Sequence, residues 1–93
     1  MAMIVRRQAD WVVAKVGDEA VMMSVRRDKN IGLNEVGVQI WEAIETPRSV
    51  DEICRLLMMR FDVTPEICRV EVERFLGELR DNGAVEFDSR QVA

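Results

Sequence analysis

The sequence predicts an α+β fold in which a three-stranded antiparallel sheet is followed by a bundle of three helices. Two observations predict this order. Apolar, β-branched runs flank a Gly17-Asp18 turn in the first third of the chain, and apolar residues recur at helical spacing in the remainder. The 93 residues are 48% hydrophobic and 32% charged, which is typical of a globular protein. We therefore expect residues 1–93 to form one domain.

The strands are expected at Trp11–Val16, Glu19–Val25 and Lys29–Leu33. A pair that begins with glycine, such as Gly17-Asp18, suits a two-residue hairpin turn between the first two strands. Gly32 interrupts the third strand, and a glycine there indicates either a close approach of another backbone or a bulge.

The helices are expected at residues 35–45, from Val50 to Phe61, and from Pro65 to a stop at Asn82-Gly83. Asn34 is a suitable N-cap for the first helix. Ser49 and Glu52 form a capping box for the second, and Thr64 precedes a proline at the first position of the third. Residues 84–87 are expected to add a short extended segment, after which the last residues should fray.

The sequence indicates no enzyme and no cofactor. It contains no histidine, which removes the commonest general base and the commonest metal ligand. Cys54 and Cys68 fall at apolar positions of helical patterns, so we expect two buried free thiols and no disulfide. With no third thiol, a metal site is not expected. There is no signal-peptide core and no apolar run of roughly 18 residues, so a cytoplasmic location is the default expectation.

An unpaired edge of the small sheet is the feature of functional interest. Lys29–Leu33 carries little of the proline or inward charge that normally protects an edge. Such an edge beside a helix suits β-augmentation, in which a peptide adds as a further strand. Two alternatives remain open, namely that the N-terminal segment "MAMIV" covers this edge or that a second copy of the chain does. A monomer or a weak homodimer is therefore expected.

The face of the third helix that carries Arg69, Glu73, Leu76 and Arg80 is a candidate for the other wall of a peptide groove. The alternative is an ordinary solvated charged face.

A DNA-binding regulator of the winged-helix class is the competing prediction, with the second and third helices as a helix-turn-helix. The formal net charge of −4 argues against it, because neutralisation of phosphates by Lys and Arg dominates affinity for nucleic acid. The third helix contains no lysine, and its arginines alternate with glutamates that would face phosphates. We therefore expect neither a nucleic-acid nor a membrane partner.

The segments "LNEVGVQIWEAIETPRSVDEICRLLMMRF" and "FLGELRDNGAV" resemble the PqqD family. The likeness includes "LN" at the strand–helix junction, "IWE" on the first helix, "SVDEI" at the start of the second and "FLxxLxxxG" at the end of the third. With the strand hairpin it extends from about Trp11 to Val85.

The resemblance implies a winged-helix-like, non-enzymatic module known as a RiPP recognition element. Such modules bind the leader segment of a precursor peptide and present it to modifying enzymes. It implies that the leader adds to the third strand and lies against the third helix. The implied contact residues are Lys29, Asn30, Ile31, Gly32, Leu33, Arg69, Val72, Glu73, Leu76 and Arg80.

Two pathways are compatible with the resemblance. In lasso-peptide biosynthesis, a stand-alone member passes its precursor to a leader peptidase and a macrocyclase. In pyrroloquinoline quinone biosynthesis, PqqD binds the precursor and works with a radical SAM enzyme. The "LNEVGVQIWE" form favours the first pathway slightly, and nothing in the sequence decides between them.

Overall fold

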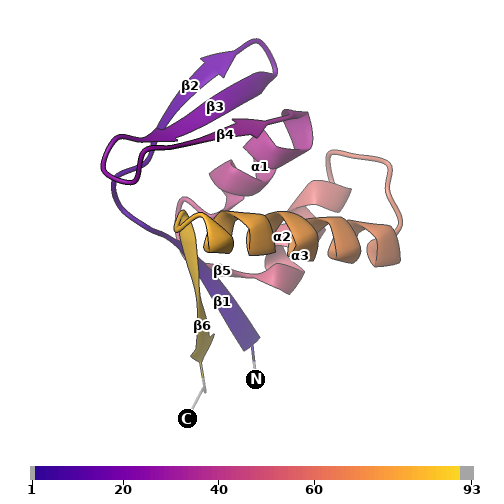
Figure 1. The fold of residues 1–93 in the computed structure, drawn as a ribbon. Helices are drawn as coiled ribbons and strands as arrows, with labels where there is room; N and C mark the ends of the chain where they lie inside the picture. Colours follow the sequence, from indigo (N-terminus) through magenta and orange to yellow (C-terminus); the bar gives the residue numbers. More distant parts are fainter. Residues whose placement is uncertain (1, 91–93) are drawn as a thin grey trace.

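The structure, a computed structural model, describes residues 2–90, which form two three-stranded antiparallel sheets and three helices (Figure 1). The elements in chain order are β1 (Ala2–Arg7), β2 (Val12–Val16), β3 (Glu19–Ser24), β4 (Lys29–Leu33), α1 (Glu35–Ala43), β5 (Arg48–Ser49), α2 (Val50–Met58), α3 (Pro65–Asp81) and β6 (Val85–Arg90). The predicted α+β class is confirmed. That the fold is winged-helix-like and that the chain forms a single domain stay predictions. The last residues, which are expected to fray, lie beyond Arg90 and outside the described residues.

The predicted three-stranded sheet is confirmed and has the order β2-β3-β4. Gly17 takes the turn with a φ of +64°, in the left-handed region that a glycine adopts without strain. Along β3, Ala20, Met22 and Ser24 point inward and are buried, while the residues between them face outward. Trp11 lies outside the strand, which begins one residue later than predicted.

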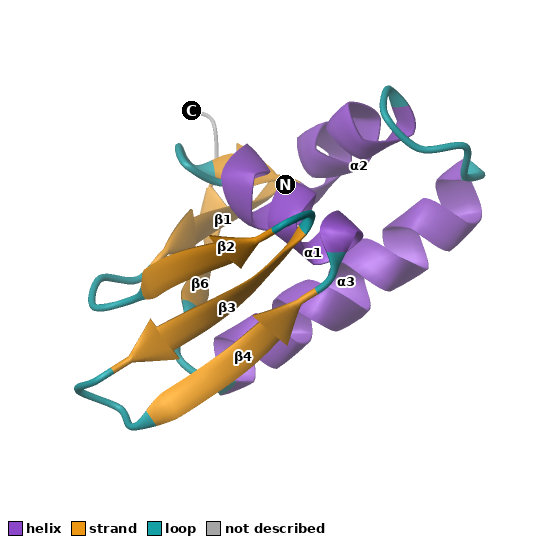
Figure 2. Ribbon diagram, turned by 90° about the horizontal axis from the view of Figure 1, so that it is seen from above, coloured by secondary structure: helices purple, strands orange, loops and turns teal. Residues whose placement is uncertain are grey.

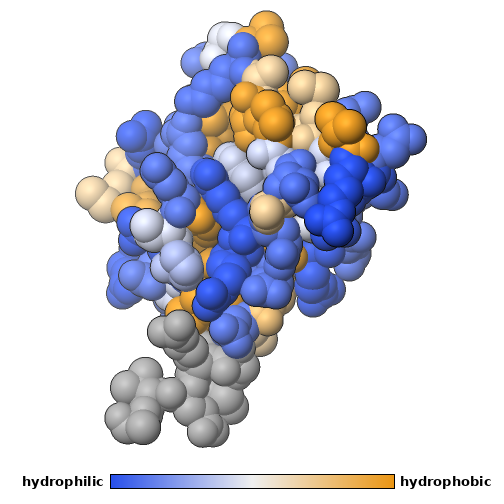
Figure 3. Space-filling model, turned by 90° about the vertical axis from the view of Figure 1, so that its left-hand side faces the viewer, coloured by the Kyte–Doolittle hydropathy of each residue, from blue (hydrophilic) through white to orange (hydrophobic). Residues whose placement is uncertain are grey.

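The outward face of this sheet is more apolar than a solvated face usually is. Val12 and Val16 of β2 are 62% and 74% exposed, and on β3 the exposed Met23 and Val21 lie opposite Val12 and Ala14. Figure 3 shows apolar side chains at the upper end of the molecule, where this sheet lies.

The second sheet, in the order β5-β1-β6, is the main feature that the sequence did not predict. β1 pairs with β6 along its whole length, from Ala2 opposite Arg90 to Arg7 opposite Val85. β5 pairs with the other edge of β1 through Arg48 and Ser49. The N-terminal segment therefore completes this sheet, and the alternative that it covers the edge of β4 is wrong.

The predicted helix starts are confirmed by their caps. Asn34 caps α1, Ser49 and Glu52 form both hydrogen bonds of the capping box on α2, and the Thr64 hydroxyl caps α3. α1 and α2 end earlier than predicted. Phe61 in particular lies in the loop after α2, held by its own N–H, which donates to the carbonyl of Leu57 at 2.8 Å.

One hydrophobic core joins the two sheets and the helices. Its fully buried members come from several elements: Val5 of β1, Met22 of β3, Ile40 of α1, Ile53 of α2 and Leu76 of α3. α1 packs on the inner face of β3 and β4, and α2 packs on α3. The core therefore fixes the position of α3 relative to β4. Figure 2 shows these two elements running in opposite directions.

Candidate functional site

The free edge of β4 is the first component of the site. Over residues 2–90, β4 pairs with β3 alone, from Ala20 opposite Leu33 to Ser24 opposite Lys29. Ile31 and Leu33 are buried inward, whereas Gly32 faces outward, and a Cβ atom added to it would meet no heavy atom within 4 Å. Because no other described strand pairs with this edge, its backbone groups are available to an added strand.

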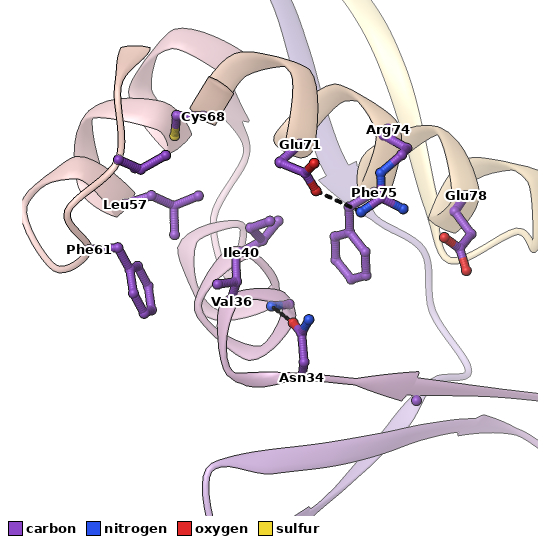
Figure 4. Close-up of a pocket in the computed structure, with 13 residues that line it drawn as sticks. Asn34, Val36, Ile40, Leu57, Phe61, Cys68, Glu71, Arg74, Phe75 and Glu78 are labelled. Atoms are coloured by element: carbon purple, nitrogen blue, oxygen red, sulfur yellow. Dashed lines mark hydrogen bonds and ion pairs between the residues drawn. The ribbon is translucent and has the colours of Figure 1, made fainter. Parts of the chain in front are cut away.

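A cavity of about 380 Å³ opens beside this edge (Figure 4). Its walls come from the end of β4, from α1, from the end of α2 and the loop that follows it, and from one flank of α3. The lining residues are Gly32, Asn34, Val36, Gly37, Ile40, Leu57, Phe61, Val63, Cys68, Glu71, Arg74, Phe75 and Glu78. An open strand edge and a helix-walled cavity are therefore adjacent.

The junction of β4 and α1 is shaped by local chemistry. The Asn34 side-chain oxygen accepts a hydrogen bond from the N–H of Gly37 at 2.8 Å, which starts α1 directly after the strand. A Cβ atom at position 37 would lie 3.2 Å from the ring of Phe75. The glycine therefore lets α3 pack closely against α1, with Phe75 at the centre of the cavity wall.

One end of the cavity is apolar. Leu57 and Cys68 are buried, while Phe61 and Val63 are partly exposed beside them. Figure 4 shows Leu57, Phe61 and Cys68 together at this end. An alternate side chain of a bound strand could be buried here.

The other end of the cavity is charged. The Arg74 guanidinium donates a hydrogen bond to the Glu71 carboxylate at 2.7 Å, and this bond raises the pKa of Arg74 above its usual value. Glu78 lies one helical turn further along the same flank of α3, and Figure 4 shows it at the end away from Phe61.

The two cysteines are free and buried, as predicted. Burial, followed by the neighbouring Cys68, raises the pKa of the Cys54 thiol to about 11, so this thiol is protonated at neutral pH. A protonated, buried thiol is a poor nucleophile. Within residues 2–90, no group of three or more His, Cys, Asp or Glu side chains is placed to hold a metal ion.

The contact residues that the resemblance implies on α3 lie away from this cavity. Val72 and Leu76 have no exposed surface, and they belong to the core. Arg69 and Glu73 form an ion pair at 3.5 Å on the opposite flank of α3, where they line a separate cavity with Phe87.

Arg80 follows the same opposite flank, with its guanidinium 5.1 Å from the ring centre of Phe87. None of these five residues lines the cavity beside β4, and the leader contact implied for them stays a prediction. The flank that faces the cavity carries Glu71, Arg74, Phe75 and Glu78 instead. The available signal was Phe75, the one aromatic residue of the helix.

Comparison with known proteins defines the family. The family model described as "Coenzyme PQQ synthesis protein D (PqqD)" matches residues 19–85. The chain belongs to the PqqD family. The resemblance drawn from the sequence motifs is therefore confirmed. The match begins at β3 and ends at the first residue of β6, so it includes β4, the three helices and the whole cavity lining.

Two solved structures share the fold. The structure described as "TbiB1 in Complex with the TbiA(beta) Leader Peptide" has a TM-score of 0.80 and 22% identity, and the alignment covers 91% of this chain and 99% of that one. "Lasso peptide synthetase B1 complexed with the leader peptide" has a TM-score of 0.76 and 17% identity, and covers 88% and 96%. No curated protein sequence gives a significant match.

No helix within residues 2–90 has the length and apolar character needed to cross a bilayer.

Proposed function

We propose that this PqqD-family protein is a non-enzymatic recognition element, located in the cytoplasm, that binds the leader segment of a precursor peptide. The leader adds as a strand to β4 and lies against α3. The protein then presents the rest of the precursor to a modifying enzyme. The observation that carries the proposal is the free edge of β4 directly beside a cavity of about 380 Å³.

Edge and cavity supply the two parts of β-augmentation. Backbone hydrogen bonds along Lys29–Leu33 provide affinity that is largely independent of sequence, and the cavity binds alternate side chains of the added strand. An extended segment that becomes ordered on binding gives up conformational entropy, so a dissociation constant between nanomolar and micromolar is expected.

Bringing the precursor to an enzyme raises its effective concentration there. Once the leader is held, the encounter of the core peptide with the enzyme becomes intramolecular, which can raise apparent affinity by orders of magnitude. This role needs no catalytic group on the recognition element itself.

The comparisons support a leader-peptide partner. Both structural relatives are described as complexes with leader peptides, and one of them is a lasso peptide synthetase component. We therefore propose a lasso-type pathway, with a leader peptidase and a macrocyclase as the enzymes. Pyrroloquinoline quinone biosynthesis with a radical SAM enzyme is the second candidate, because the matching family model is described by that pathway.

The test is a titration of the isotope-labelled protein with the precursor peptide encoded beside it in the genome. We expect amide shifts at Asn30 and Gly32 and along the cavity, which nuclear magnetic resonance would follow. Shifts confined to elements remote from β4 and α3 would contradict the groove.

A pair of matched variants tests the cavity wall. Phe75→Ala removes the central apolar wall and should weaken binding about tenfold. Val70→Ala changes a 62% exposed residue of the same helix that does not line the cavity, and should leave affinity unchanged. Circular dichroism would show whether both variants remain folded, and equal affinities in the two folded variants would count against the proposal.

A further inference from the structure

We infer that the charged end of the cavity selects leader segments that carry a lysine or arginine about four residues from the large apolar side chain bound near Phe61. This inference rests on the proposed leader-binding function and specifies the chemistry of the ligand. The residue that selects the basic side chain is Glu78.

The carboxylates of the cavity flank differ in how they are neutralised. Glu71 is bonded to Arg74 at 2.7 Å. Within residues 2–90, no ion pair engages the side chain of Glu78, although Arg74 is close enough for Glu78 to raise its pKa further. The flank therefore has two carboxylates and one guanidinium, which leaves one negative charge at its far end.

Among the described residues, the facing strand forms no ion pair with this carboxylate. Lys29 is the one cation that β4 contributes, and no ion pair of the described residues joins it to Glu78. The protein as a whole has a formal net charge of −4, which adds to the preference for a basic segment over an acidic one.

The spacing follows from the geometry of helix and strand. Cys68, at the apolar end, and Glu78 are ten residues apart on α3, which corresponds to about 15 Å along the helix axis. A strand rises about 3.4 Å per residue, so four residues span about 14 Å. An even separation also keeps both side chains on one face of the added strand.

Figure 4 shows Glu78 on the side of Asn34 where β4 lies and Phe61 on the other side, so a strand added to β4 that continues past its end would pass both ends of the cavity in sequence. The separation of four residues is expected whichever direction the added strand takes. The apolar side chain is buried near Phe61, and the basic side chain extends to the Glu78 carboxylate at the solvent-exposed end.

The experiment is a selection from a display library of random 16-residue peptides against the wild-type protein. We expect enriched sequences to share a large apolar residue and a lysine or arginine at a separation of four. Replacing that basic residue with glutamine in a selected peptide should weaken binding to the wild type about five-fold in a fluorescence anisotropy titration.

A double-mutant cycle assigns the effect to Glu78. The same peptide substitution should have little effect on binding to Glu78→Gln, because the two changes remove one interaction. Glu66→Gln is the matched control, since it removes the same charge from the same helix at a position that does not line the cavity, and it should retain the five-fold effect.

The outcomes distinguish a failure of the charge selection by Glu78 from a failure of the proposed leader binding. Selected peptides that bind in competition with the precursor but lack a basic residue at this separation would overturn the charge selection and leave leader binding intact. Equal losses on wild type and Glu78→Gln would do the same. A library that yields no binder, together with no binding of the precursor, would overturn both.

Discussion

The C-terminal end of α3 allows a prediction in which two glycine substitutions act with opposite sign. Gly83 has a φ of +80°, and the backbone around it forms the two hydrogen bonds of a Schellman motif, from Ala84 to Leu79 at 2.8 Å and from Gly83 to Arg80 at 2.9 Å. The motif requires the left-handed conformation at position 83. The carbonyl of Gly83 also accepts a hydrogen bond from the Trp11 indole at 3.2 Å, which ties this turn to the segment before β2.

Gly83→Ala is expected to lower the free energy of unfolding by about 1–2 kcal/mol. Most of this is the cost of holding an L-residue in the left-handed region. The added Cβ atom would lie 2.6 Å from the guanidinium of Arg27, but that group is the end of a flexible side chain and can move at small cost.

Gly77→Ala is the matched control, in the interior of the same helix, where a Cβ atom would meet nothing within 4 Å. It should raise the free energy of unfolding by about 1 kcal/mol, because alanine has the higher helix propensity. Urea unfolding followed by circular dichroism at 222 nm measures both changes, and each 1 kcal/mol should move the melting temperature by about 4–8 °C. A Gly83→Ala protein as stable as the wild type would refute the assigned turn conformation.

Two further predictions concern the helix cap and the thiols. Asn34→Ala should lower the free energy of unfolding by about 1 kcal/mol and speed hydrogen exchange of the Gly37 amide, because it removes the 2.8 Å capping bond. Asn34→Asp should restore the protection of this amide. Unchanged exchange in Asn34→Ala would contradict the cap. Cys54 and Cys68 should react with a disulfide reagent at pH 8 far more slowly in the native protein than in denaturant, because they are buried and the pKa of Cys54 is raised to about 11. A rapid reaction of the native protein at pH 8 would contradict the burial. An unfolded thiol ionises near pH 8.5, whereas the native Cys54 thiol keeps its proton to higher pH. The free energy of unfolding should therefore fall from about pH 9 towards pH 11.

The parts of the fold that are determined by residues close together in the sequence could be predicted. The Gly17-Asp18 turn, the Asn34 cap, the Ser49–Glu52 box and the Thr64-Pro65 start are each specified within four residues. Local hydrogen bonds and backbone preferences determine these features, so a local pattern is sufficient evidence.

The sheet of β1, β5 and β6 could not be predicted in this way. β1 and β6 lie at opposite ends of the described chain, and no turn residue indicates their pairing. Val5 and Val85 are buried where the strands meet the core, but an apolar residue in a short segment does not identify its partner. Long-range pairing is decided by the packing of the whole domain.

The flank of α3 that lines the cavity could not be predicted for a similar reason. Both flanks of its buried stripe carry arginine and glutamate at helical spacing, Arg69 and Glu73 on one side and Glu71 and Arg74 on the other. Sequence periodicity identifies the buried stripe but does not indicate which of its two flanks faces the sheet. The packing of α3 in the common core, with Phe75 against Gly37, determines which flank faces β4.

The pairing of β1 with β6 has a practical consequence for attachment. Ala2 lies opposite Arg90, so any polypeptide continuing from either end would leave the molecule at one pole, and Figure 1 places β4 towards the other. An affinity handle, a fluorophore or a fused enzyme could be joined at either terminus without obstructing access to β4. A short peptide bridging the two ends should likewise permit circular permutants opened at the Gly17-Asp18 hairpin.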